Sequence, residues 1–139
     1  MSEAETQTRA HKILLIEDEE FLRRIFKSRL AGAGYDVADV GSAEAGLEWL
    51  KSTQPDLIIL DLYLPKMDGF EFLAHLKANP TRRETPVLIL SGLGQEADIR
   101  RGLELGAQEY VVKTKVSPQD LLAKIRKMLA DENARPQAG

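Results

Sequence analysis

Short apolar runs alternate with segments of helical spacing along most of this 139-residue chain. The runs are Ile13–Ile16, Tyr35–Val40, Leu57–Leu60, Val87–Leu90 and Tyr110–Val112. Three of them are short, continuous and aliphatic, which is typical of strands buried on both faces of a parallel sheet. We therefore expect five strands, each followed by a helix.

The segments that follow the strands place apolar residues on one side of a helix. The first segment groups Leu22, Ile25, Phe26 and Leu30, and the fourth groups Ile99 and Leu103. Ser117-Pro118-Gln119-Asp120 has the residues of a helix start, and Asn79-Pro80 predicts the end of the third helix. We interpret Asp68-Gly69 as a turn between the third strand and the third helix.

Five strand-helix units in succession predict an α/β fold with one doubly wound, five-stranded parallel sheet. The expected strand order is the flavodoxin-like 2-1-3-4-5, with helices on both faces. We expect the folded domain over residues 11–130, between flexible tails at residues 1–10 and 131–139. Ligands of such sheets bind at the carboxyl ends of the strands, where the strand order reverses.

Composition excludes several functions. The net charge is −3, from 19 basic and 22 acidic residues, which argues against direct binding of nucleic acid. The absence of cysteine excludes disulfides, thiol catalysis and thiolate metal sites. The N-terminus lacks the apolar run of a signal peptide, and no apolar stretch approaches the length of a membrane span. We expect a cytoplasmic protein with no membrane insertion.

Polar side chains follow four of the predicted strands at the edge where a ligand would bind. Glu17 and Asp18 follow the first strand, Asp61 the third, Ser91 the fourth and Lys113 the fifth. Each alone has a structural explanation, as a cap, a turn or a surface residue. Glu19 and Glu20 are assigned in this way to the start of the first helix. The convergence of the other five predicts a functional site.

Crowded carboxylates repel one another unless a cation lies among them. Oxygen ligands favour a hard ion, so Mg²⁺ is the expected cofactor and Mn²⁺ is an alternative. A metal, a lysine and a hydroxyl around one carboxylate suit phosphoryl transfer. Asp61 is the best candidate nucleophile, because it ends the central strand between the other groups.

Four segments match a known family in order and on the expected elements. They are Ile13–Glu19, Asp61-Leu62-Tyr63-Leu64-Pro65-Lys66-Met67-Asp68-Gly69, Val87–Gly92 and Gly106–Lys113. Through them the sequence resembles the receiver domains of two-component response regulators over about residues 12–130. The resemblance implies a signalling switch in a phosphorelay, and not an enzyme, although the domain would assist its own phosphotransfer and slow autodephosphorylation.

The resemblance also implies roles at the metal site. Asp61 would accept a phosphoryl group from a histidine kinase or a phosphotransfer protein. Asp18 and Asp61 would ligate Mg²⁺ directly, Glu17 would act through water, and Tyr63 would contribute its backbone carbonyl.

Three further roles follow from the resemblance. Lys113 would pair with the acyl phosphate, Ser91 would hydrogen-bond a phosphoryl oxygen, and Tyr110 would swing inward to the space that Ser91 vacates. The face formed by the fourth helix, the fifth strand and the fifth helix would then change its affinity for a protein effector. Dimerisation on phosphorylation stays open.

Three features go beyond the shared motifs. Thr114 stands where the family usually has a proline joined by a cis bond, so either the bond is trans and the loop rearranges, or the strain is tolerated.

Arg23 and Lys27 are interpreted as an exposed face of the first helix that docks the phosphodonor, or else as solvated charges. Tyr63 and Leu93 offer no carboxylate or amide to orient water, which predicts a long-lived phosphorylated state.

Other functions of the same fold are less consistent with the sequence. An aspartyl-phosphatase usually has a second acid two residues after its nucleophile, where this chain has Tyr63. A phosphate-independent interaction module would have degraded site residues, and a flavodoxin-like cofactor binder would have a phosphate-cradling loop. Only nine residues follow Ala130, so we expect either a stand-alone regulator or a receiver domain cut from a longer protein.

Overall fold

The computed structural model describes residues 10–92 and 94–134 of the chain. It contains one five-stranded sheet with the order β2-β1-β3-β4-β5, in which all neighbouring strands are parallel. The strands are β1 (Lys12–Ile16), β2 (Asp36–Val40), β3 (Leu57–Leu60), β4 (Val87–Ser91) and β5 (Glu109–Val112). The predicted fold class and strand order are therefore confirmed.

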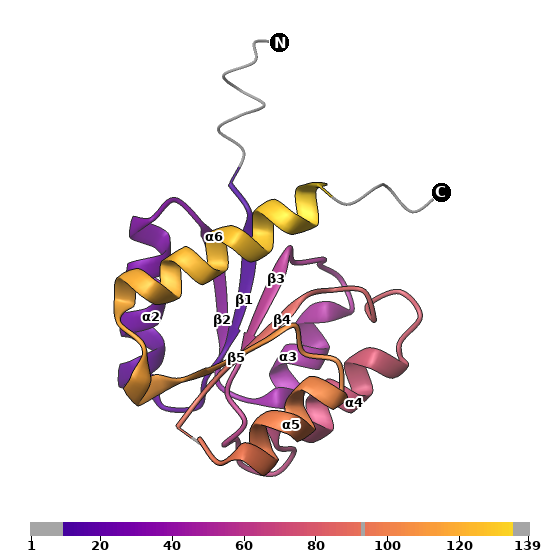
Figure 1. Cartoon of the computed structure of the whole chain (residues 1–139). Helices are drawn as coiled ribbons and strands as arrows, with labels where there is room; N and C mark the ends of the chain where they lie inside the picture. The colour runs from indigo at the N-terminus through magenta and orange to yellow at the C-terminus, as the bar shows by residue number, and fades with distance from the viewer. Residues whose placement is uncertain (1–9, 93, 135–139) are drawn as a thin grey trace.

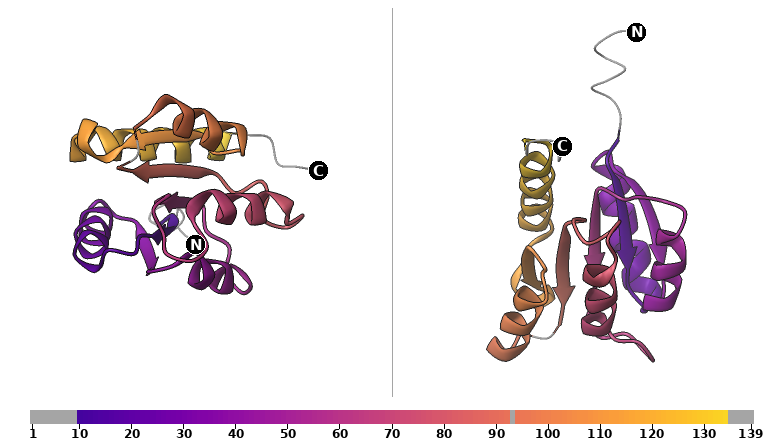
Figure 2. Two further views of the ribbon diagram at one scale, coloured as in Figure 1. Left: turned by 90° about the horizontal axis from the view of Figure 1, so that it is seen from below. Right: turned by 90° about the vertical axis from the view of Figure 1, so that its right-hand side faces the viewer.

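Helices cover both faces of the sheet, as Figure 1 shows and as the two further views in Figure 2 bear out. One layer consists of α2 (Glu20–Gly32) and α6 (Pro118–Ala134). The other consists of α3 (Ala43–Leu50), α4 (Gly69–Ala78) and α5 (Glu96–Glu104). A short 3-10 helix, η1 (Lys113–Lys115), joins β5 to the loop before α6. Most of the expected tails, residues 1–9 and 135–139, lies outside the described residues, while α6 continues through residues 131–134.

The core has two parts, one on each face of the sheet. Every residue of β3 and β4 is buried, as expected for central strands that helices cover on both sides. Alternate residues of each strand enter the two clusters: Leu14 and Ile16 pack with α3 and α4, whereas Ile13 and Leu15 pack with α2 and α6. This packing holds the carboxyl ends of the strands rigidly at one edge. Among the described residues, no helix is long and apolar enough to cross a membrane.

Two local expectations need correction. Asp68 is not part of a simple turn: its side chain caps α4 in a reciprocal capping box with Glu71, because its carboxylate accepts from the Glu71 N–H. Leu103 does not face the sheet and is 44% exposed. Gly102 takes the inward position, where a Cβ atom would lie 2.6 Å from Ile89 Cδ1, so α5 lies too close to the sheet for a side chain there.

Candidate functional site

The predicted site residues meet at the carboxyl edge of the sheet. Glu17 and Asp18 follow β1, Asp61 follows β3, Ser91 ends β4 and Lys113 follows β5. The strands are parallel and paired in register, so these positions lie side by side although up to 96 residues separate them along the chain. Four of them line a pocket of about 450 Å³ together with Leu64, Pro65 and Gly92, whereas Ser91 is fully buried beside it.

Three carboxylates form the acidic part of the site. One oxygen from each of Glu17, Asp18 and Asp61 can be chosen so that all three lie within 4.8 Å of one another. Glu17 and Asp61 are only 3% and 4% exposed, whereas Asp18 is exposed. The cluster therefore has two shielded acids and one that faces the pocket opening.

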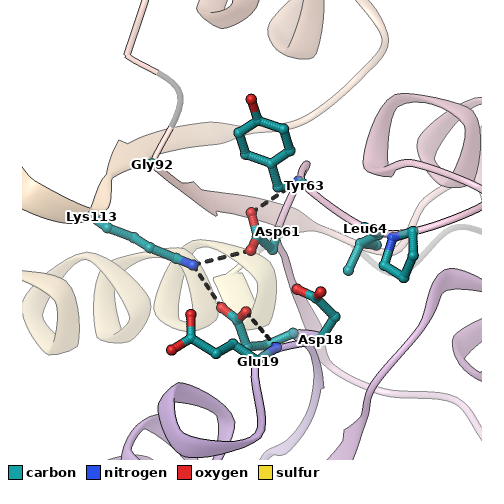
Figure 3. A pocket seen from close by; sticks show the side chains of 9 residues that line it. Asp18, Glu19, Asp61, Tyr63, Leu64, Gly92 and Lys113 are labelled. Carbon is teal, nitrogen blue, oxygen red and sulfur yellow. Dashed lines mark hydrogen bonds and ion pairs between the residues drawn. The ribbon is translucent and has the colours of Figure 1, made fainter.

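Lys113 lies between the two buried carboxylates. Its Nζ is 2.7 Å from Glu17 Oε1 and 3.1 Å from Asp61 Oδ2 (Figure 3). Burial alone would lower the pKa of Lys113, but the hydrogen bonds and charges of Glu17 and Asp61 outweigh burial and raise that pKa. Lys113 therefore carries a positive charge at neutral pH and offsets part of the negative charge around it.

Burial also raises the pKa of the Glu17 carboxyl, and the charge of Asp61 adds to this effect. The hydrogen bond from Lys113 opposes the increase, as does the backbone N–H of Glu19, which donates to Glu17 Oε2 at 3.1 Å. Glu17 is thus a carboxylate whose charge depends on nearby donors and cations.

The backbone orients Asp61. The N–H of Tyr63 donates to Asp61 Oδ1 at 3.1 Å, while Lys113 holds the other oxygen. In Figure 3 the Tyr63 ring points away from the carboxylates at the rim of the pocket, and Tyr63 is 68% exposed. Asp61 therefore has a fixed carboxylate that faces a pocket with an open rim.

The donor chemistry of this cluster fits a hard divalent cation. Oxygen-only ligands favour Mg²⁺, which usually takes one or two carboxylates and keeps several waters. The exposed Asp18 leaves room for those waters, and the pocket is large enough to hold them. Asp18 and Asp61, with Glu17 behind them, are the described residues able to hold such an ion.

Ser91 and Tyr110 lie on the β5 side of the site. Ser91 is fully buried and its side chain is hydrogen-bonded to the Tyr110 hydroxyl. Burial, together with the charges of Asp98 and Asp61, raises the pKa of Tyr110 to about 12, although the bond to Ser91 opposes the increase. Tyr110 is therefore a neutral phenol that connects Ser91 with the inner side of α5, where its ring lies close to Gly102.

The residue after Lys113 does not introduce a cis bond. All peptide bonds of the described residues are trans, so the Lys113–Thr114 bond is trans and the chain turns through η1. The first of the two alternatives for Thr114 therefore holds. Leu93, the second residue expected to shield the site from water, lies outside the described residues.

The expected exposed face of Arg23 and Lys27 holds for Lys27, whose side chain is 48% exposed, but not for Arg23, whose side chain is 21% exposed. Docking of the phosphodonor at this face stays a prediction. Arg23 Nε lies 3.1 Å from Asp39 Oδ2, and Lys27 Nζ lies 2.8 Å from Asp39 Oδ1. Arg23 Nη1 also donates to the backbone carbonyl of Glu17 at 2.9 Å. Helical spacing correctly placed the two cations on one side of α2, but that side faces the end of β2.

Sequence reasoning missed two residues that contact the site backbone. Arg23 reaches the Glu17 carbonyl, and Gly69 at the start of α4 lies against the backbone of Asp61 and Leu62. Gly69 had a sequence signal, since a glycine after a capping residue indicates either a turn or a close backbone approach. Arg23 had none, because its partners are 6 and 16 residues away and on different elements.

Known proteins match nearly the whole described chain. A family model described as the response regulator receiver domain matches residues 13–126. The "Probable transcriptional regulator ycf27" of Porphyridium aerugineum is 41% identical over 118 residues, which cover 85% of this chain and 48% of the relative. The chain spans about half the length of the curated relatives it matches.

Solved structures agree with the family model. A putative response regulator from Chloroflexus aurantiacus J-10-fl has a TM-score of 0.82 and 30% identity, covering 88% of this chain and 99% of that one. The chemotaxis protein CheY4 of Vibrio cholerae has a TM-score of 0.80 and 27% identity, covering 86% and 99%.

Proposed function

The chain belongs to the response regulator receiver domain family of two-component signalling, and we propose that it is a switch that accepts a phosphoryl group on Asp61. The observation that carries the proposal is the convergence of three carboxylates and Lys113 on one pocket, with Asp61 in the middle. Asp61 is buried yet oriented by the Tyr63 N–H and by Lys113, as a positioned nucleophile should be.

In the transfer step, a carboxylate oxygen of Asp61 attacks the phosphorus of a phosphohistidine. The new P–O bond gives an acyl phosphate, and the P–N bond breaks so that its electron pair returns to the imidazole, which leaves with the donor protein. Lys113 lies where its ammonium can pair with the added negative charge, and its raised pKa keeps it protonated for that role. The protein is itself the acceptor, so it acts as a signalling switch and not as a turnover enzyme.

Mg²⁺, or Mn²⁺ in its place, would supply positive charge that offsets the charge of the phosphoryl oxygens. Asp18 and Asp61 would hold the ion directly, Glu17 through water, and Tyr63 through its backbone carbonyl. The oxygen-only donor set supports this assignment.

We assign the output to the face of α5, β5 and α6. A phosphoryl group adds about −1.5 to −2 charge and three acceptor oxygens next to Ser91, whose partner Tyr110 lies against α5. A change at Ser91 can thus reach α5 through two contacts. The proposed partners are a histidine kinase or phosphotransfer protein on the input side and a protein effector on the output side, and the effector can be a second copy of the chain.

Intact-mass spectrometry after incubation with acetyl phosphate and Mg²⁺ tests the proposal. The wild type should gain the mass of one phosphoryl group, and hydroxylamine should remove it. Asp61→Asn should keep the circular dichroism of the wild type and gain no phosphoryl group. Full labelling of Asp61→Asn on another residue, or labelling of the wild type in excess chelator, would contradict the assignment.

A further inference from the structure

Arg23 connects the acidic turn of the site to a strand that contributes no ligand. Its guanidinium donates from Nη1 to the Glu17 carbonyl at 2.9 Å and from Nε to Asp39 Oδ2 at 3.1 Å. The Arg23 side chain is 21% exposed, so both bonds are partly shielded from water. These two bonds use the fork geometry that distinguishes arginine from lysine.

The carbonyl that Arg23 binds belongs to the peptide unit between Glu17 and Asp18. The N–H of Glu17 donates to the Val40 carbonyl at 3.1 Å, which is the last rung between β1 and the end of β2. β2 ends at Val40, and the Glu17 carbonyl accepts a hydrogen bond from the Arg23 guanidinium instead of from a further residue of β2. The orientation of this peptide unit decides where the exposed carboxylate of Asp18 points.

Asp39 and Gly41 define the place of the guanidinium. Asp39 accepts from both Arg23 and Lys27, so it is held between two cations. Gly41 leaves space for the guanidinium, since a Cβ atom at this position would lie 3.0 Å from Arg23 Nη1. Arg23 is therefore a rigid support and not a surface charge.

We propose that Arg23 is a positioning residue for the divalent metal: it fixes the Glu17–Asp18 peptide so that the Asp18 carboxylate points at the ion. The inference rests on the proposed function, because it assumes that Asp18 and Asp61 hold the metal. Outer contacts of this kind typically change metal affinity by about 10–100-fold when they are removed.

The direction of the change in metal affinity distinguishes a positioning role of Arg23 from a purely electrostatic one. Arg23 is a cation close to a site for a cation, so its removal lowers electrostatic repulsion and by itself would tighten metal binding. A loss of affinity in Arg23→Gln can therefore arise only from lost geometry. Arg23→Lys keeps the charge but cannot form the two-bond fork, so it should resemble Arg23→Gln.

The test is a titration of the full chain with Mn²⁺, followed by electron paramagnetic resonance of the free ion. Arg24→Gln is the matched control, since Arg24 is the next residue of the same helix, is 76% exposed and pairs only with Glu20 among the bonds of the described residues. Arg23→Gln and Arg23→Lys should weaken Mn²⁺ binding by about tenfold or more, and Arg24→Gln should leave it within about twofold of the wild type.

Two results would overturn different parts of the proposal. Unchanged or tighter binding in Arg23→Gln overturns the inference, whereas failure of the wild type to bind Mn²⁺ overturns the proposed metal site itself. If circular dichroism shows that Arg23→Gln is unfolded, Gly41→Ala replaces it, because this change crowds the guanidinium and keeps every charge. Weaker Mn²⁺ binding in folded Gly41→Ala supports the inference, and wild-type binding overturns it.

Discussion

Replacement of Gly69 by alanine should damage both the stability and the chemistry of the domain. An added Cβ atom would lie 2.6 Å from the carbonyl oxygen of Asp61, 2.6 Å from Leu62 Cα and 2.9 Å from Leu62 Cδ2. Two of these three atoms belong to the backbone, which cannot rotate away as a side chain can. The helix α4 and the strand end that bears Asp61 must therefore separate.

The separation is resisted on both sides. The Gly69 N–H donates to the Leu62 carbonyl at 3.1 Å, and Phe72, Leu73 and Leu76 bury α4 in the core. Overpacking in such places costs about 1–3 kcal/mol, and we expect the upper end, about 3 kcal/mol, because backbone must move. To lengthen the 2.6 Å contacts to the ordinary van der Waals distance of 3.4 Å, Asp61 or α4 must move by about 0.8 Å. A misplacement near 1 Å can slow a reaction by about 10²-fold.

Urea unfolding and the rate of labelling by acetyl phosphate measure the two effects. Gly32→Ala is the matched control: it makes the same chemical change at the last residue of α2, where a Cβ atom meets nothing within 4 Å. This control should be neutral or up to about 1 kcal/mol more stable, with wild-type labelling. Equal stability and equal labelling rates in Gly69→Ala and Gly32→Ala would refute the reasoning.

Three further predictions concern the site and its surroundings. Asp18→Ala should weaken Mg²⁺ binding, measured by tryptophan or tyrosine fluorescence, far more than Glu19→Ala, and equal effects would show that the ligands are misassigned. Tyr63→Asn combined with Leu93→Glu should shorten the lifetime of the phosphorylated protein, because polar side chains can orient a water, whereas an unchanged or slower decay would exclude shielding. Burial alone would raise the pKa of Asp39, but two basic side chains of α2 outweigh burial and lower that pKa. Asp39 therefore stabilises the folded state fully above its unfolded pKa of about 3.8. This stabilisation is lost as pH falls through the lower pKa of Asp39 in the folded state. The urea midpoint of the wild type should thus fall more steeply with acid than that of Asp39→Asn. An equal dependence of the two midpoints on pH would contradict the stabilising role of the Asp39 ion pairs.

Sequence alone predicted the features that depend on local pattern and chain direction. Continuous aliphatic runs identified the central strands, because strands covered on both faces have no polar side. Once the strands were taken as parallel, their carboxyl ends had to meet at one edge, which brought Glu17, Asp18, Asp61 and Lys113 together. The capping residues before α6 and the end of α4 followed from side chains and backbone groups within a few residues.

Tertiary structure decided which of the available partners each polar group takes. Helical spacing placed Arg23 and Lys27 on one side of α2, but only the position of β2 directs that side to Asp39 and to the Glu17 carbonyl. The same spacing directed Leu103 inward, yet the close approach of α5 admits only Gly102 there. Periodicity specifies a face of a helix, whereas the depth and rotation of that helix against the sheet depend on contacts between residues distant in sequence. For that reason the acidic cluster could be predicted from the chain, whereas the contact of Arg23 with the Glu17 carbonyl could not.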